Sequence, residues 1–372
     1  MRRVLTLIAT LMVLETITPG TVQVEARAPT PPELRTAQVP VGSDRSAESD
    51  ATAALERLGG SRIVLKVDED ALRKQMLEEL REDARRLLRE SRITVVSLVV
   101  RDMSVEVRIR DDTDPQVVLA KLAGTSVPLP SGAATVNVRE AGERVIRLTP
   151  TQAAFDDRAQ TSLSASVDIV RRRVMELRIA AAAVQRDGGD RILVLLPGVK
   201  DPARVLTLLG SRAHLAFRLV EVGGSLSEAM QGRGSPDVEV LYPAGGKSNL
   251  PQLVRREVVM DGGDIADANP GFDRRTGEPV VTFRFNARGT RRFAQITHEN
   301  VGRPFAIVLD NEIVSAPIIR EPILGGTGQI SGNFTVESAN DLAILMRGGM
   351  LPARLTVVEQ QVIKGKSEAP PK

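Results

Sequence analysis

The 372-residue chain contains no cysteine and no tryptophan, and its single tyrosine is Tyr242. The absence of cysteine excludes disulfides, thiolate-ligated zinc, thiol catalysis and a lipidated N-terminal cysteine. Aromatic residues make up only 2% of the sequence, so leucine, valine, isoleucine and alanine must build most of the core. Because single-stranded nucleic acids stack on aromatic side chains, this scarcity also argues against a nucleic-acid partner.

Histidine is almost as scarce, with His214 in an alternating strand pattern and His298 near a predicted helix end. Histidines in these settings are better explained as structural residues than as a metal pair or a catalytic base, although a role for His298 alone stays open. No nucleophile, base and orienting group can be assembled from the sequence. We therefore expect a protein that is not an enzyme and that has no catalytic, cofactor-binding or metal-binding residues.

Long apolar runs are missing except at the N-terminus. Arg2 and Arg3 precede the run Val4–Leu14, which is shorter than the roughly 20 residues needed to span a bilayer. Small residues up to Ala26 fit a signal-peptidase site. Residues 1–26 are therefore interpreted as a signal peptide, with a short membrane anchor as the alternative. We expect an exported protein that is either soluble beyond the membrane or tethered to it by this segment.

The charges are nearly balanced, with a formal net charge of +3 and a pI of about 9.4. Basic and acidic residues alternate along the predicted helices, which argues against a phosphate-tracking patch. The composition is that of a soluble globular protein, and the length suits two or three domains. Residues 27–57, with four prolines, and the polar tail 365–372 are predicted to be disordered.

Two regular stretches share the order strand, helix, strand, strand, helix, strand. This is the ferredoxin-like order, so the predicted fold class is α+β, with two ferredoxin-like βαββαβ modules at 58–140 and 141–222 forming a base. The letters repeat too, since DPQVVLAKLAG at Asp114–Gly124 resembles DPARVLTLLG at Asp201–Gly210. The expected strands are Arg62–Val67, Ile93–Val100, Val105–Ile109 and Thr135–Val138 in the first module, and Val145–Leu148, Ala181–Gln185, Arg191–Leu196 and His214–Val220 in the second.

A Gly/Ser/Pro-rich connection at 223–252 leads to a predicted α+β head subdomain at 253–352, which is inserted into the base. A return strand at 353–364 then rejoins the base. The expected head elements are strands at Arg255–Val259 and Val280–Phe285, helices at Ala287–His298 and Thr335–Arg347, a hairpin of Phe305–Leu309 with Glu312–Ala316, and a loop at Gly325–Gly332.

Three motifs could be interpreted as functional sites, but a structural interpretation explains each of them better. The segment Gly325–Gly332 lacks the Lys-Ser/Thr of a phosphate-binding loop, so its glycines are assigned to backbone turning. Asp261, Asp264 and Asp267 lack the spacing of a calcium loop and are interpreted as turn residues. The three consecutive arginines Arg171–Arg173 point around a helix, and we expect a solvated edge with ion pairs to neighbouring acids.

The segment Ala316–Gly326 (APIIREPILGG) places four large aliphatic residues between prolines, where an ordinary central strand cannot form. They are Ile318, Ile319, Ile323 and Leu324. The favoured interpretation is that they fill the core of the head, because most isoleucines are buried. The alternative is a mobile apolar lip that holds an unfolded chain.

Two long motifs lie in the second predicted module, IVRRRVMELRI at Ile169–Ile179 and DRILVLLPGVKDPARVLTLLG at Asp190–Gly210. They resemble the base of the first periplasmic domain of the SecD family, membrane subunits that assist bacterial protein export. GFDRRTGEPVVTFRF and ENVGRPFAIVLDNEIVSAPIIREPILGGTGQISGNFTVESANDLA are similar to its head subdomain. LGGSRIVLKVDED from Leu58 resembles the segment after the family's first membrane helix, so the resemblance covers about Leu58 to Val362.

The chain also departs from the family. SecD continues into membrane helices whose acidic residues are linked to proton-driven function, and no such helices follow within these 372 residues. In place of the family's Leu-Asp-Leu-x-Gly-Gly, this chain has LERLGG at Leu55–Gly60. The resemblance therefore implies only the preprotein-handling periplasmic part, and proton conduction is not carried over.

The resemblance implies a periplasmic module that assists export by binding unfolded or emerging preproteins, with Sec translocon components as further partners. Ile318, Ile319, Ile323 and Leu324 are the candidate preprotein contacts. No nucleic-acid partner and no cofactor are expected, and membrane association would come through the N-terminal segment. The alternative is a diverged periplasmic scaffold or regulator that binds a folded envelope or translocon partner.

Overall fold

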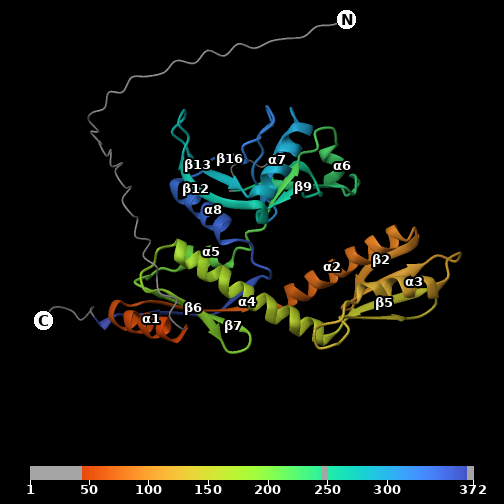
Figure 1. Ribbon diagram of the computed structural model, residues 1–372, viewed down its shortest axis with the longest axis horizontal. Helices are drawn as coiled ribbons and strands as arrows, with labels where there is room; N and C mark the ends of the chain where they lie inside the picture. The colour runs from red at the N-terminus through yellow and green to blue at the C-terminus, as the bar shows by residue number, and fades with distance from the viewer. Residues whose placement is uncertain (1–43, 245–249, 367–372) are drawn as a thin grey trace, which may run out of the picture. The chain divides into compact units, whose positions relative to one another are not determined.

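A computed structural model of the chain describes residues 44–244 and 250–366 (Figure 1). The predicted signal peptide or anchor, the linker up to residue 43 and the tail from residue 367 lie outside the described residues. None of the helices within the described ranges is both long enough and apolar enough to cross a membrane.

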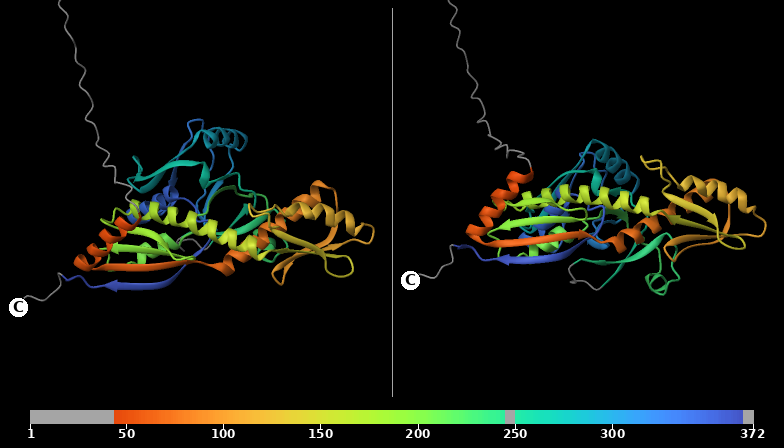
Figure 2. Two further views of the ribbon diagram at one scale, coloured as in Figure 1. Left: turned by 60° about the horizontal axis from the view of Figure 1, so that its bottom comes forward. Right: turned by 90° about the horizontal axis from the view of Figure 1, so that it is seen from below.

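The base is a four-stranded antiparallel sheet in the order β17-β1-β7-β6. Figure 2 shows the last strand, in blue, beside the first strand of the chain. Ile63 and Leu65 pack with the two helices α4 and α5 on one face, whereas Val64 packs with helix α1 on the other. The elements are α1 (Asp44–Leu58), β1 (Gly60–Val67), α4 (Gln152–Glu176), β6 (Ala183–Asp187), β7 (Arg191–Pro197), α5 (Ala203–Gly210) and β17 (Leu355–Ile363).

Helix α1 corrects the prediction that residues 27–57 are disordered throughout. Ala51, Ala54 and Leu55 follow helical spacing and are buried, and two of them join the cluster on the second face of the base sheet. The prolines that suggested disorder all precede Asp44. In the range of the predicted return strand at 353–364, the structure has β17, which pairs with β1 of the base sheet.

The second sheet is also antiparallel, in the order β2-β3-β5-β4, and helices α2 and α3 cover one of its faces. Val105, Val107, Ile146 and Leu148 form the strand side of this core. The elements are α2 (Glu69–Glu90), β2 (Val95–Arg101), β3 (Ser104–Ile109), α3 (Pro115–Leu122), a short 3-10 turn at Ala123–Thr125, β4 (Val136–Glu140) and β5 (Val145–Pro150).

The two sheets are not the consecutive modules that the sequence predicts, because their first strands are exchanged. β1 was assigned to the first module but lies in the base sheet, and β5 was assigned to the second but lies between β3 and β4. Burial explains the exchange. β1 is buried on both faces, as a strand between α1 and α4 must be, whereas β5 buries only Ile146 and Leu148 on one face.

The head consists of two further sheets, in the orders β10-β9-β15-β14-β8-β11 and β12-β13-β16. Within the larger sheet only the β15–β9 pair is parallel. The elements of the whole head are β8 (Leu215–Leu219), α6 (Leu226–Met230), β9 (Val238–Pro243), β10 (Gln252–Arg255), β11 (Met260–Asp261), β12 (Ile265–Phe272), β13 (Pro279–Phe285), α7 (Ala287–Glu299), β14 (Phe305–Leu309), β15 (Glu312–Ser315), β16 (Thr327–Ser331) and α8 (Val336–Gly348), with a 3-10 turn at Gly262–Asp264.

Several head predictions are confirmed and others are corrected. Both helices and the hairpin form, and Asp310 and Asn311 adopt the left-handed turn conformation with φ of 48° and 71°. The strand expected to close the second module is β8, which pairs with β14 instead. The connection 223–252 contains α6 and β9, the strand at 255–259 does not form, and the loop 325–332 contains β16.

The buried side chain of Arg173 joins the two places where the chain crosses between base and head. Its guanidinium donates to the carbonyl oxygens of Leu208 at 2.7 Å and Ser211 at 2.6 Å, on the way into β8. It also donates to that of Gly349 at 2.8 Å, on the way out of α8. Gly348 must lack a side chain, since a Cβ would lie 2.6 Å from Arg173 Cγ.

Arg173 therefore corrects the prediction of a solvated arginine edge. It is 0% exposed, and burial lowers the pKa of its guanidinium to about 10, opposed by the negative charge of Asp310. Asp310 in turn accepts hydrogen bonds from the backbone N–H of His214 at 2.8 Å and of Ala213 at 3.2 Å. The contact of His214 with Asp310 is thus made by its backbone N–H.

We predict that Arg173→Met lowers the free energy of unfolding by about 3 kcal/mol or more, because it leaves several buried carbonyls without donors. Urea unfolding followed by circular dichroism measures this. The matched control is Arg172→Met, whose exposed side chain makes one 3.3 Å bond to Gly348 and should cost less than about 1 kcal/mol. Equal losses in the two variants would contradict the role assigned to Arg173.

Candidate functional site: an apolar pocket at the edge of the head

A pocket of about 260 Å³ opens between the two sheets of the head. Phenylalanines from both sheets and from α7 line it, together with the segment that follows β15. The phenylalanines are Phe217, Phe283, Phe293 and Phe305. Their rings contact one another, with centroid distances of 5.8 Å for both Phe217–Phe283 and Phe217–Phe305. The scarce aromatic residues of this chain are thus concentrated in one core.

Backbone hydrogen bonds hold the segment that forms the rim of this pocket. Ile319 N–H donates to Arg303 O at 3.0 Å, and Ile319 O accepts from Gly302 N–H at 2.8 Å. Further along, Ile323 N–H donates to Thr297 Oγ1 at 2.9 Å. The segment is therefore fixed at two points, to the loop between α7 and β14 and to α7 itself, and a short stretch between them carries the rim.

The structure separates the four candidate contact residues into two groups. Ile319 is 5% exposed and Ile323 packs against the head core, as the core interpretation expects. Ile318 and Leu324 are 60% and 73% exposed, as a lip would require. Three of the four, Ile318, Ile319 and Ile323, line the pocket, and Leu324 lies outside its lining.

Glycines next to the rim keep the pocket open and explain the glycine-rich motif. A Cβ on Gly328 would lie 2.4 Å from the Phe283 ring, in the wall of the pocket. Gly326 has a φ of +63°, and a Cβ there would lie 2.1 Å from Thr290 Oγ1. Both positions need glycine for close approach, which accounts for this part of the motif without a phosphate ligand.

Sequence reasoning missed the phenylalanines and Thr297 as parts of one site. The available signal was their distribution, since Phe217, Phe283, Phe285, Phe293 and Phe305 fall within a short part of a chain with eight phenylalanines. What the sequence does not show is that β8 leaves the base and brings Phe217 to the other four.

The other candidate residues do not gather into a site. His298 is exposed on α7. Asp264 is buried and pairs with Arg288 at 2.9 Å, whereas Asp261 accepts from Gly263 N–H at 2.8 Å. Asp267 accepts from the neighbouring Ala268 N–H. Within the described ranges, no group of three or more histidines, cysteines or acids is placed to hold a metal ion.

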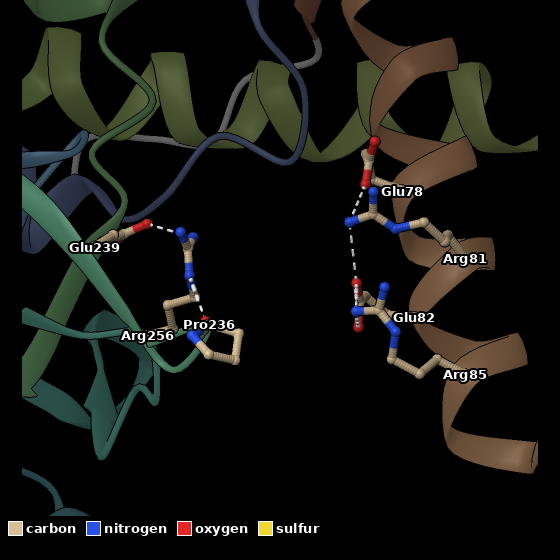
Figure 3. Close-up of polar contacts among 7 residues, drawn as sticks. All are labelled: Glu78, Arg81, Glu82, Arg85, Pro236, Glu239 and Arg256. Atoms are coloured by element: carbon tan, nitrogen blue, oxygen red, sulfur yellow. Dashed lines mark hydrogen bonds and ion pairs between the residues drawn. The ribbon is translucent and has the colours of Figure 1, made fainter. Parts of the chain in front are cut away.

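Figure 3 shows two groups of paired charged residues, one around Glu239 of β9 and the other along helix α2. Arg256 bonds Glu239 at 2.7 Å and the carbonyl of Pro236 at 3.0 Å. On α2, Glu78 pairs with Arg81 at 2.7 Å and Glu82 with Arg85 at 2.9 Å. A cavity of about 730 Å³ beside β9 and β10 is lined by several charged residues, of which Glu221 and Arg255 form an ion pair at 3.0 Å.

Asp273 ties the turn between β12 and β13 to strand β16. Its carboxylate accepts from Gln329 Nε2 at 2.9 Å, from Thr276 N–H at 2.9 Å and from Arg275 N–H at 2.8 Å. These bonds, with that of Gln329 the largest contributor, lower the pKa of Asp273 to about 2. The bonds therefore favour the folded turn above the ordinary aspartate pKa of about 3.9 and lose this effect as the pH falls through about 2.

We predict that Gln329→Ala raises the pKa of Asp273 towards its ordinary value, because it removes the largest cause of the shift. A carboxylate titration by NMR on the wild type and the variant measures this. Thr282→Ala, an exposed change on the neighbouring strand β13, serves as the control and should leave the pKa of Asp273 near 2. An unchanged pKa in Gln329→Ala would show that the Asp273–Gln329 bond is not formed in solution.

Comparison with known proteins gives two matching family models. Residues 238–353 match the SecDF P1 head subdomain, and residues 163–222 match the N-terminal part of the P1 domain of protein translocase subunit SecDF. The first match covers β9 to α8 and therefore includes the pocket lining except Phe217 of β8. The second covers most of α4, the hairpin of β6 and β7, α5 and β8.

Curated relatives give the same result. The chain is 37% identical over 311 residues to protein translocase subunit SecD of Acetobacter pasteurianus, covering 83% of this chain and 58% of that protein. It is 33% identical over 309 residues to that of Rickettsia bellii, with the same coverage. The chain thus spans less than two thirds of the length of these relatives.

Among solved structures, one described as "Structure and function of a membrane component SecDF that enhances protein export" is 32% identical, with a TM-score of 0.43 over 54% of this chain and 92% of that one. The family models and the curated relatives agree across the base and the head. The chain therefore belongs to the SecD family of protein translocase subunits, with the P1 head subdomain at residues 238–353.

Proposed function

We propose that this chain assists protein export by holding unfolded or emerging preprotein segments at the apolar pocket of the head. The observation that carries the proposal is the pocket, where a phenylalanine-lined hollow lies beside exposed Ile318. Exposed apolar surface around a concave site is what a protein that receives other polypeptides needs. The relatives named as protein translocase subunits supply the biological setting.

The lining of the pocket supports binding in place of covalent chemistry. Its charged or polar side chains are Thr297, Arg320, Glu321 and Gln329. Thr297 is buried and its hydroxyl already bonds Phe293 O at 2.8 Å and Ile323 N–H. No nucleophile and base lie together there, so the proposed role is that of a binding module without catalytic activity.

The proposed location is the periplasm, reached by the N-terminal segment acting as a signal peptide or as a single anchor. There the head would meet preproteins beside components of the Sec translocon. These partners and this location rest on membership of the SecD family.

One further observation favours the alternative of a folded partner. The uncovered face of the sheet β2-β3-β5-β4 carries Arg101, Arg108, Arg139 and Arg147 but only one acid, Glu106, by the cross-strand register. Glu106 pairs with Arg147 at 2.7 Å, while Arg108 and Arg139 form no ion pair with any described residue. Such a face would suit a folded acidic partner, and a scaffold or regulatory role would use it.

We predict that a photo-crosslinking residue at Ile318 or Leu324 labels a stalled preprotein, because both side chains are exposed beside the pocket. The same residue at Val96, which is 61% exposed in β2, is the matched control and should label little. Labelled products separated by electrophoresis and identified by mass spectrometry measure the difference. Labelling from Val96 alone, or of one folded partner alone, would contradict the proposal and favour the alternative.

A further inference from the structure

We infer that the open edge of β16 receives an extended polypeptide segment as an added strand, one of whose side chains enters the neighbouring pocket. The inference rests on the proposed function, because it specifies how a client would be held at that pocket. An added strand would bind through main-chain hydrogen bonds, which a purely apolar contact in the pocket does not require.

The edge of β16 that faces away from β13 offers unpaired main-chain groups. In an antiparallel pair, alternate residues direct their N–H and C=O groups to the partner strand. Phe285 N–H donates to Gly326 O, and the register continues as Phe283 with Gly328. The outward set is therefore Thr327, Gln329 and Ser331, all of which have exposed side chains.

Only the far end of this edge is occupied, since Ser331 O accepts from Ser315 Oγ at 2.7 Å. The main-chain groups of Thr327 and Gln329 on this side have no hydrogen-bond partner within the described ranges. Two or more residues of an incoming strand can pair there. An added strand would lie beside β16 as the fourth strand of the sheet β12-β13-β16.

The sequence of β16 lacks the features that normally protect an open edge. Proteins block such edges with charges, prolines, bulges or covering elements. β16 reads TGQIS and has neither a charge nor a proline. By contrast, β12 at the other side of the same sheet contains Pro270, and the outer strand β17 of the base has a register irregularity.

The pocket lies directly beside this edge. Gly328 and Gln329 of β16 line it together with Ile318 and Ile319. Side chains alternate along a strand, so an added strand would direct every second residue towards the pocket and the others to solvent. The volume of about 260 Å³ compares with ~30 Å³ for one liquid water, so the pocket has room for a large aliphatic or aromatic side chain.

The charges around the site indicate the class of segment that it would accept. The strand edge is uncharged, and the rim carries one charge of each sign, Arg320 and Glu321, neither of which forms an ion pair with a described residue. The complementary ligand is therefore an extended, uncharged polypeptide segment with a large apolar residue, flanked by charges of either sign. Many unfolded polypeptides contain such segments, and folded proteins rarely expose them.

The test uses the chain as it exists and a fluorescent peptide, Ser-Thr-Leu-Thr-Leu-Thr-Ser, with binding followed by anisotropy. Two N-methylated sets are compared, one methylated at the two leucines and the other at the three threonines that alternate with them. A strand added to β16 bonds through only one of these sets, so we expect methylation of that set to weaken binding by about tenfold or more and methylation of the other by less than about twofold.

A variant pair tests the same bond from the protein side. Gln329→Pro removes the outward N–H, and proline is tolerated on an open strand edge. Gln329→Ala keeps the N–H while losing the side-chain bond to Asp273, and is the matched control. We expect Gln329→Pro to lose about tenfold in affinity relative to Gln329→Ala.

The outcomes separate the two levels of the proposal. Binding that is equally sensitive to both methylated sets overturns the added strand and leaves the pocket as a purely apolar site. Absence of binding by the unmodified peptide, together with absence of crosslinking from Ile318, overturns the proposed function as well. The peptide comparison uses the unaltered chain, so it remains decisive even if Gln329→Pro does not fold.

Discussion

The arrangement of base and head depends on the hydrogen bonds that the buried guanidinium of Arg173 donates to backbone carbonyls. The chain enters the head after α5 and leaves it after α8, and carbonyls at both crossings accept hydrogen bonds from this one side chain. A buried charge without a bonded carboxylate is costly, and only several well-placed acceptors offset the cost. The crossings must therefore stay together for the charge to be satisfied. Arg347 of α8 adds an ion pair to Glu176 of α4 at 2.7 Å beside this junction.

β8 pairs with β14 in the head, and its Phe217 packs there with the other phenylalanines of the head core. The two head sheets meet around these rings but leave a hollow where Gly328 has no side chain and the segment after β15 leaves the sheet. The pocket thus depends on the absence of a side chain at Gly328 and on the path of the segment after β15. An uncharged strand edge lies on one side of the hollow and an exposed isoleucine on the other, which suits a polypeptide ligand better than a small polar molecule.

Local signals in the sequence predicted local structure well. Asp310-Asn311 predicted its turn because both residues tolerate positive φ, and the Gly348-Gly349 pair correctly marked the end of α8. Strand pairing is harder to predict. β1 and β5 are each the first strand of a predicted module, and they differ mainly in whether one or both faces are buried. The sequence predicts a loop where β16 forms, because Gly328 within the strand and Gly326 just before it, which Phe283 and Thr290 require, are the usual sign of a turn. Arg173 was misplaced because a helix position does not reveal which backbone crosses over it.

The candidate site was predicted in part. The apolar segment Ala316–Gly326 stood out by its prolines and isoleucines, but only the fold separates buried Ile319 from exposed Ile318. The phenylalanines that face them come from β8, β13, α7 and β14, and composition cannot predict that these four elements meet around one pocket.

The most direct test of the central claim is methyl NMR of the isoleucines in this chain on adding one protein in two states, permanently unfolded and natively folded. The account predicts that the unfolded form shifts the methyl signals of Ile318, Ile319 and Ile323, while the folded form leaves them unchanged. Shifts produced only by the folded form, or shifts confined to isoleucines outside the head, would contradict it.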